Sequence, residues 1–165
     1  MAGEMVKALE FSADGTVLRL LDQRRLPAEE IWHELREIEP LAEAIETLTV
    51  RGAPAIGCAA AAGLAAASFG FSSDRSRFDV QVRAALERLS RTRPTAVNLF
   101  VALEQLREVL EGAGEACSVE ELRGRLVHAA RIHIEHDIAM NRAIGGHGAA
   151  LMPAGGVLTL SLIHI

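Results

Sequence analysis

The pattern of apolar and polar positions divides the chain into a short strand-like region followed by long helical segments. Residues 5–11 and 16–22 alternate roughly between apolar and polar side chains, which is the period of a half-buried strand. Asp14-Gly15 between them is a typical hairpin turn. Residues 30–36 alternate similarly, although their spacing also fits one helix face. We therefore predict three short antiparallel strands, with the third at 30–36.

Beyond these strands, apolar residues recur every three or four positions, which predicts amphipathic helices. Pro40 is expected to open the first helix, and the small-residue run 58–68 belongs to a second, deeply packed helix. Two further helices follow. The predicted apolar faces are Leu41, Ala44, Ile45 and Leu48; Phe78, Val82, Leu86 and Leu89; and Leu99, Leu103, Leu106 and Leu110.

The last helix has a clear start and a predicted stop. Ser118-Val-Glu-Glu121 is a capping box, which satisfies two free N–H groups at a helix start. We expect the helix to run to about Ile144 and to break at Gly145-Gly-His-Gly148. Val157-Leu-Thr159 then predicts the beginning of a buried strand.

The stretch from Thr49 to Gly57 joins two predicted helices and has the composition of an anion-binding helix start. Pro54 suits the first helical position, because its missing N–H would have no intrahelical partner there. Arg51, Gly52 and Ala53 would then sit where free N–H groups and the helix dipole attract anions. The forked guanidinium of Arg51 suits phosphate. The stretch predicts a site for a phosphorylated or carboxylated small molecule.

A second junction repeats this arrangement. Arg93 stands directly before Pro94, and we expect Pro94 to open the helix that carries the Leu99–Leu110 stripe. Two such helix starts, if they converge in space, would hold one anion between Arg51 and Arg93.

Composition and charge exclude several classes of function. The 165 residues are 50% hydrophobic but only 4% aromatic, and the net charge is −5 with no Lys/Arg block. Nucleic-acid binding is therefore disfavoured. Cys58 and Cys117 form no C-x-x-C pair, which indicates a reducing, cytoplasmic protein. We find no signal peptide, and the run 53–69 is too short and too weakly hydrophobic to predict a membrane span.

Several other residues have a plain structural interpretation. His133 and His136 do not form the His-Glu-x-x-His pattern, so we predict no metal site. Gly57 and Gly63 are expected to serve close packing, and Cys58 to be a small buried hydrophobe. Asp22 and Gln23 are expected to have a structural role, in which they join the sheet to the loop that carries Arg51. For Asn98 and Asn141, helix packing and active-site support stay open as alternatives.

Four motifs occur in a characteristic order along the chain. They resemble the methylthioribose-1-phosphate isomerase family, the aldose–ketose isomerases of methionine salvage. The wider family includes ribose-1,5-bisphosphate isomerase and the regulatory subunits of translation initiation factor 2B. The motifs are Leu20-Leu-Asp-Gln23 with Leu26-Pro27, Val50-Arg-Gly-Ala-Pro-Ala-Ile-Gly57, Arg93-Pro-Thr-Ala-Val-Asn-Leu99 and Asp137-Ile-Ala-Met-Asn-Arg-Ala-Ile-Gly145.

The resemblance implies a fold, an activity and a set of site residues. It implies an α+β N-terminal domain of a small antiparallel sheet plus helices, followed by a Rossmann-like α/β domain, in a cytoplasmic homodimer. The implied reaction converts 5-methylthioribose 1-phosphate to 5-methylthioribulose 1-phosphate without a cofactor, and no nucleic acid or membrane takes part. Arg51, Gly52, Ala53 and Arg93 would contact the sugar phosphate. The acid–base pair, a cysteine and an aspartate, would come from the Rossmann-like domain.

The sequence departs from the family pattern after Thr159. A His-Cys-Asn segment would follow there, but the chain reads Leu160-Ser-Leu-Ile-His-Ile165, the in-frame translation of a common transposase adapter. We therefore expect an N-terminal domain at 1–145, the first strand of a truncated Rossmann-like domain at 146–159, and a non-native tail at 160–165. No catalytic residue is expected in this chain, which should be inactive and poorly soluble because of its apolar end.

Two alternatives to the methylthioribose-phosphate isomerase stay open. One is a non-catalytic regulatory subunit like those of initiation factor 2B, and retention of both Arg51 and Arg93 argues against it. The other is a ribose-1,5-bisphosphate isomerase, which the motif forms disfavour.

Overall fold

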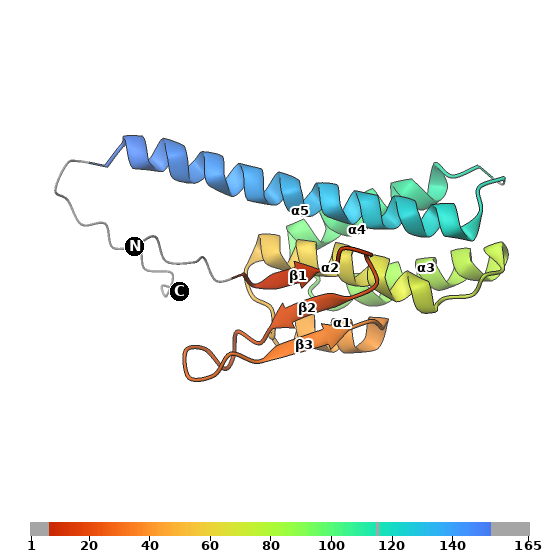
Figure 1. The fold of residues 1–165 in the computed structure, drawn as a ribbon, viewed down its shortest axis with the longest axis horizontal. Coiled ribbons are helices and arrows are strands. Elements are labelled where there is room, and N and C mark those ends of the chain that lie inside the picture. Colours follow the sequence, from red (N-terminus) through yellow and green to blue (C-terminus); the bar gives the residue numbers. More distant parts are fainter. Residues whose placement is uncertain (1–6, 115, 153–165) are drawn as a thin grey trace.

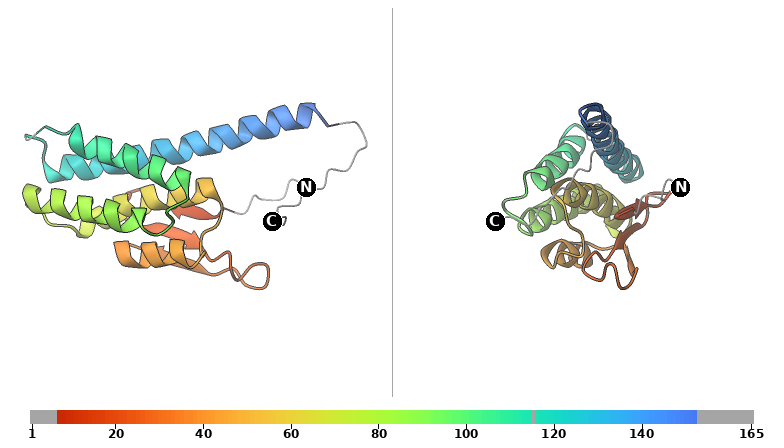
Figure 2. Two further views of the ribbon diagram at one scale, coloured as in Figure 1. Left: turned by 180° about the vertical axis from the view of Figure 1, so that it is seen from behind. Right: turned by 90° about the vertical axis from the view of Figure 1, so that its left-hand side faces the viewer.

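The fold is organised around one apolar helix. The computed structural model describes residues 7–114 and 116–152. Helix α2 (Ala53–Ala67) is buried from Ile56 to its end. It contacts all three strands and the other four α-helices, and its central position is visible in Figure 1 and in the end view of Figure 2. Its side chains are mostly Ala and Gly, so neighbouring elements approach its backbone closely.

The predicted sheet is confirmed. Strands β1 (Leu9–Phe11), β2 (Leu18–Leu21) and β3 (Trp32–Leu35) pair antiparallel in the order β1-β2-β3. The strands are shorter than the alternating segments predicted, and residues 5 and 6 lie outside the described part. Gly15 takes a φ of +76° in the β1–β2 turn, as the turn signal requires. The buried face of the sheet packs on α2.

The predicted helices are also present. They are α1 (Ile38–Glu46), α2, α3 (Arg75–Ser90), α4 (Val97–Glu111) and α5 (Val119–Ala150), with a short 3-10 turn η1 (Ser68–Gly70) after α2. Every predicted apolar-face residue except Leu48 is buried. The chain is thus an α+β fold with a three-stranded sheet and five α-helices in the described residues.

The prediction for Leu48 is wrong, because α1 ends before it. The N–H of Thr49 donates to the carbonyl of Ala44 (2.9 Å), and the N–H of Leu48 donates to the carbonyl of Ile45 (3.4 Å). This is the Schellman arrangement, which places the residue after the cap in the left-handed region. Leu48 accordingly has a φ of +61° and is 39% exposed.

The predicted start of α4 is also wrong. Pro94 precedes the helix, which begins at Val97 with Ala96 as its cap. The N–H of Ala96 donates to the carbonyl of Arg93 (3.0 Å), closing a turn with Pro94 at its second position. Proline favours that position because its φ is already correct for the turn.

The predicted break of the last helix at Gly145-Gly-His-Gly148 does not occur, and α5 continues to Ala150. A glycine costs a helix about 1 kcal/mol relative to alanine but does not prevent helical hydrogen bonding. The expected domain boundary at 145/146 therefore falls inside α5. This half of the helix extends beyond the rest of the fold (Figures 1 and 2). The predicted strand at 157–159 and the tail at 160–165 lie outside the described residues.

The hydropathy of helix α2 differs from our expectation that the run 53–69 is too short and too weakly hydrophobic to span a membrane. The segment Ala53–Gly70 is long and apolar enough, by length and composition, to cross a membrane, contrary to our expectation. However, 72% of it is buried inside the fold. Its apolar composition is accounted for by its place in the core, where it is surrounded by the sheet and four helices.

Candidate functional site

The two arginine junctions line the same pocket. It has a volume of about 360 Å³ and lies where the Arg51 loop approaches the turn before α4. All four residues expected to contact the sugar phosphate line it. The complete lining is Leu48, Arg51, Gly52, Ala53, Ile56, Arg93, Thr95 and Ala96.

On the α2 side, backbone donors and a glycine define the pocket. Gly52 is the N-cap of α2, and its φ of +94° lies in the region that glycine tolerates best. Pro54 is the second helical residue rather than the first as predicted. No side chain caps this helix end, so the first N–H groups, including that of Ala53, have no intrahelical partner.

On the α4 side, the turn at Arg93 is held by local hydrogen bonds. The hydroxyl of Thr92 donates to the carbonyl of Leu89 (2.7 Å), and Thr92 is buried. Ala96 caps α4 without a side-chain hydrogen bond. The N-terminus of α4, like that of α2, therefore offers free N–H groups beside the pocket. By contrast, Asp74 caps α3 and Ser118 caps α5.

The electrostatic character of the pocket is positive. Its lining contains two guanidinium groups and no carboxylate. Among the described residues, neither Arg51 nor Arg93 has a side-chain hydrogen bond or an ion pair, whereas nearby Arg91 pairs with Glu87. Two unpaired arginines beside two uncapped helix N-termini are the arrangement that binds a phosphate or carboxylate group.

The end of strand β2 contacts the loop that carries Arg51. The backbone N–H of Gln23 donates to the carbonyl of Thr49 (3.0 Å), which confirms the contact expected between the β2 end and this loop. The buried carboxylate of Asp22 accepts from Nη2 of Arg24 (2.7 Å) and lies 3.4 Å from Nε2 of His33. The Arg24 guanidinium, opposed by burial, holds the pKa of Asp22 well below its usual range.

The remaining residues singled out in the sequence take structural positions. Gly57 packs on the backbone of Asn98 and Gly63 on Leu41, as expected for packing glycines. Asn98 is half-buried. The amide of Asn141 donates to the carbonyl of Asp137 (2.9 Å) within exposed α5. None of these side chains lines the pocket.

Cys58 and His133 are also structural. Burial, followed by the nearby charge of Asp137, raises the pKa of the Cys58 thiol to about 12. Nδ1 of His133 lies 2.7 Å from Oε1 of Gln105, and burial lowers the pKa of this histidine. Within 7–114 and 116–152, no group of three or more His, Cys, Asp or Glu side chains is placed to hold a metal.

Four lining residues were not among the predicted site residues: Leu48, Ile56, Thr95 and Ala96. Thr95 lies in the Arg93-Pro-Thr motif, and its place after Arg-Pro in a turn was an available signal. Leu48 was assigned to the core face of α1, because its spacing fits that face and its sequence gives no sign of the Schellman turn.

The chain matches proteins of known sequence over most of its length. It is 44% identical over 149 residues to methylthioribose-1-phosphate isomerase of Desulfitobacterium hafniense (strain Y51), covering 90% of this chain and 43% of that protein. It is 46% identical over 161 residues to the enzyme of that name from Thioalkalivibrio sulfidiphilus (strain HL-EbGR7), covering 96% of this chain and 44% of that protein. The chain therefore spans less than half the length of these relatives.

Two solved structures share the fold. Superposition on 5-methylthioribose 1-phosphate isomerase from Pyrococcus horikoshii OT3 gives a TM-score of 0.84 at 34% identity, covering 91% of this chain and 42% of that chain. Superposition on translation initiation factor eIF-2B, subunit delta, from A. fulgidus gives 0.79 at 37% identity, covering 92% and 43%. Residues 49–162 match the Initiation factor 2 subunit family. With the pocket motifs inside the matched segment and the fold shared with both structures, the chain belongs to the initiation factor 2 subunit family.

Proposed function

We propose that this chain is the phosphate-binding, N-terminal part of an aldose–ketose isomerase. The complete enzyme converts 5-methylthioribose 1-phosphate to 5-methylthioribulose 1-phosphate in methionine salvage. The observation that carries the proposal is the positive pocket at the starts of α2 and α4, lined by Arg51, Gly52, Ala53 and Arg93. The names of the relatives at 44–46% identity support the same substrate.

The chemistry explains why such a pocket is useful. In an aldose 1-phosphate the phosphate is attached to the anomeric oxygen, so the sugar ring has to open before hydrogen moves from C2 to C1. The guanidinium groups of Arg51 and Arg93, with the free N–H groups of α2, would hold the phosphate through this change. A fixed phosphate orients the two reacting carbons towards the groups that move the proton.

Those acid–base groups belong to the rest of the proposed enzyme. We expect a cysteine and an aspartate from a Rossmann-like domain, which would begin within 146–159, to transfer the proton without a cofactor. Cys58 does not fill this role, since its thiol is buried and stays protonated at neutral pH. We further propose that the complete protein is a cytoplasmic homodimer that binds neither nucleic acid nor membrane.

Calorimetric titration of the purified chain tests the phosphate-binding part of the proposal. Inorganic phosphate and 5-methylthioribose 1-phosphate should both bind, and Arg51→Ala and Arg93→Ala should each weaken binding about tenfold or more. Arg91→Ala is the matched control, because Arg91 is a nearby arginine outside the pocket and paired with Glu87. Unchanged affinity in a folded Arg93→Ala variant would refute the site.

A regulatory subunit is the second candidate, favoured by the fold shared with the eIF-2B delta subunit from A. fulgidus. An isomerase assay on a protein that contains this chain followed by the proposed Rossmann-like domain distinguishes the two. Turnover of 5-methylthioribose 1-phosphate supports the first proposal. Turnover of ribose 1,5-bisphosphate instead would identify the other isomerase, and absence of both activities would favour the regulatory subunit.

A further inference from the structure

Helices α1 and α3 each lead into one of the two loops that carry the pocket arginines. The chain leaves α1 at Glu46 and reaches Arg51 through one short loop. It leaves α3 at Ser90 and reaches Arg93 through another. The relative position of the ends of α1 and α3 therefore contributes to the separation between Arg51 and Arg93, together with the packing of α2 on α4.

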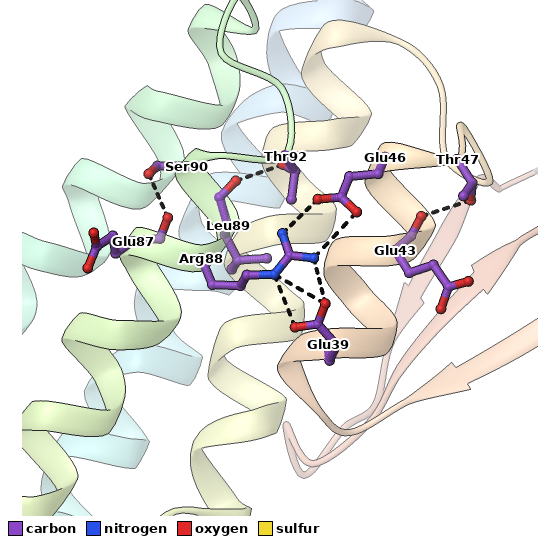
Figure 3. Close-up of polar contacts among 9 residues, drawn as sticks. All are labelled: Glu39, Glu43, Glu46, Thr47, Glu87, Arg88, Leu89, Ser90 and Thr92. Atoms are coloured by element: carbon purple, nitrogen blue, oxygen red, sulfur yellow. Dashed lines mark hydrogen bonds and ion pairs between the residues drawn. The ribbon is translucent and has the colours of Figure 1, made fainter.

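One side chain joins these ends. Arg88, in the last turn of α3, donates from Nη1 to Oε1 of Glu46 (2.7 Å) and from Nη2 to Oε1 of Glu39 (2.6 Å). Its Nε also donates to Oε2 of Glu39 (3.0 Å). We call Arg88, Glu39 and Glu46 the Arg88 bridge; Figure 3 shows the guanidinium between the two carboxylates. The bridge holds α3 to both the first and the last turn of α1.

The bridge makes more hydrogen bonds than a single surface ion pair, although the side chain of Glu39 is 70% exposed. Arg88 is only 29% exposed in its side chain, and it uses all three guanidinium nitrogens. A planar fork that bonds two carboxylates fixes the direction as well as the distance of its partners. The consequence we expect is therefore geometric more than energetic, since exposed ion pairs add little stability.

Both connections from the bridge to the pocket are short and hydrogen-bonded. After Glu46, the hydroxyl of Thr47 donates to the carbonyl of Glu43 (2.8 Å), and the Schellman turn ends at buried Thr49. After Arg88, buried Thr92 donates both its N–H (3.1 Å) and its hydroxyl (2.7 Å) to the carbonyl of Leu89. Figure 3 shows the Thr47 and Thr92 contacts on either side of the bridge.

We propose that Arg88 is a positioning residue that sets the spacing of the Arg51 and Arg93 loops through its bridge to α1. Arg88 does not line the pocket, so it would act through the two loops and not through direct contact with a ligand. Its effect on ligand affinity rests on the proposed function, but its effect on loop spacing does not. The two effects are therefore measured separately.

Spin labels measure the spacing without any ligand. Leu48→Cys and Thr95→Cys place one nitroxide on each loop, at exposed positions that line the same pocket, in a Cys117→Ser background. The dipolar coupling between the two nitroxides reports the distance between the loops, and Arg88→Ala should broaden the distribution of this distance. Arg83→Ala is the matched control, because Arg83 lies in α3 like Arg88 but pairs with Glu111 of α4, so its removal should leave the distribution unchanged. A coupling that is equally narrow in Arg88→Ala overturns the proposal.

Calorimetry with inorganic phosphate measures the second effect. Arg88→Ala should weaken binding about fivefold, and Arg83→Ala should change it by less than about twofold. If Arg88→Ala fails to fold, the double variant Glu39→Gln/Glu46→Gln removes the bridge and keeps the arginine in place. If the unaltered chain binds no phosphate, the proposed site fails, while the spin-label result still decides the role of Arg88.

Discussion

The Cα of Gly57 in α2 faces the backbone carbonyl of Asn98 in α4, so closely that a Cβ at Gly57 would lie 2.8 Å from that oxygen. A backbone carbonyl in a helix cannot move aside like the end of a side chain. Gly57→Ala should therefore push α4 away from α2 and lower the free energy of unfolding by about 1–3 kcal/mol, despite alanine's better helix propensity. Urea unfolding followed by circular dichroism measures this.

The control is a glycine of α5 with free space around it. Apart from the neighbouring residues and backbone of its own helix, no atom lies within 4 Å of a Cβ built at Gly124, so Gly124→Ala should stabilise the chain by about 0.5–1 kcal/mol. Opposite signs for the two substitutions would attribute the loss at Gly57 to contact with α4. A stabilised Gly57→Ala variant would contradict the close packing.

Leu48 holds a backbone conformation that costs a leucine about 1–2 kcal/mol relative to glycine. Leu48→Gly should therefore raise the free energy of unfolding by about 1 kcal/mol, because the exposed side chain contributes little burial in return. Leu48→Ala keeps the left-handed strain and should give no gain. Thermal unfolding of both variants decides the point, and equal stabilities would show that the strain is absent.

Asp22 should make stability depend on pH in the acid range. Because Arg24 lowers the pKa of Asp22 in the folded chain, the charged carboxylate stabilises the fold above its unfolded pKa of about 4. That contribution is lost as the pH falls below about 4. Asp22→Asn should cost about 2 kcal/mol at pH 7, and the difference should shrink with falling pH.

Urea denaturation between pH 3 and 7 measures this dependence, with Glu29→Gln as a control. Glu29 is exposed and has no ion pair within the described residues. A constant difference between Asp22→Asn and the unaltered chain over this range would show that the carboxylate's charge does not contribute.

The two cysteines should differ sharply in alkylation. With its pKa raised to about 12, Cys58 is a thiolate in roughly one molecule in ten thousand at pH 8, and it is also buried. Cys117 is only half-buried. Iodoacetamide followed by mass spectrometry should label Cys117 first and Cys58 only after denaturation. Labelling of native Cys58 at the rate of Cys117 would indicate an open core.

Helical periodicity predicted the core well, because within a helix the spacing of apolar residues determines which side chains share the buried face. Leu99 and Leu106 are buried where their spacing places them. Helix ends were predicted less well, since they depend on backbone hydrogen bonds that composition does not reveal. Pro94 favours a turn as readily as a helix start, and the glycines at 145–148 are tolerated within α5.

The sequence predicted the two arginines of the pocket but not the Arg88 bridge between the helices that lead to them. Arg51 precedes Pro54 by three residues and Arg93 directly precedes Pro94, so a shared site could be inferred from the order of residues alone. Arg88 carries no such mark, because its partners Glu39 and Glu46 are far away in sequence and meet it only when α1 packs on α3.

The burial of α2 determines how this sequence can change over evolution. Between Ile56 and Ala67 nine of the twelve residues are Ala or Gly, and all twelve are buried. A substitution there is limited by volume before polarity, so serine should be accepted more often than valine or leucine. In a saturation library of α2, the variants that fold should accordingly be those with small side chains. Across the family, residues of this segment should vary less than those on the outer faces of α3 and α5.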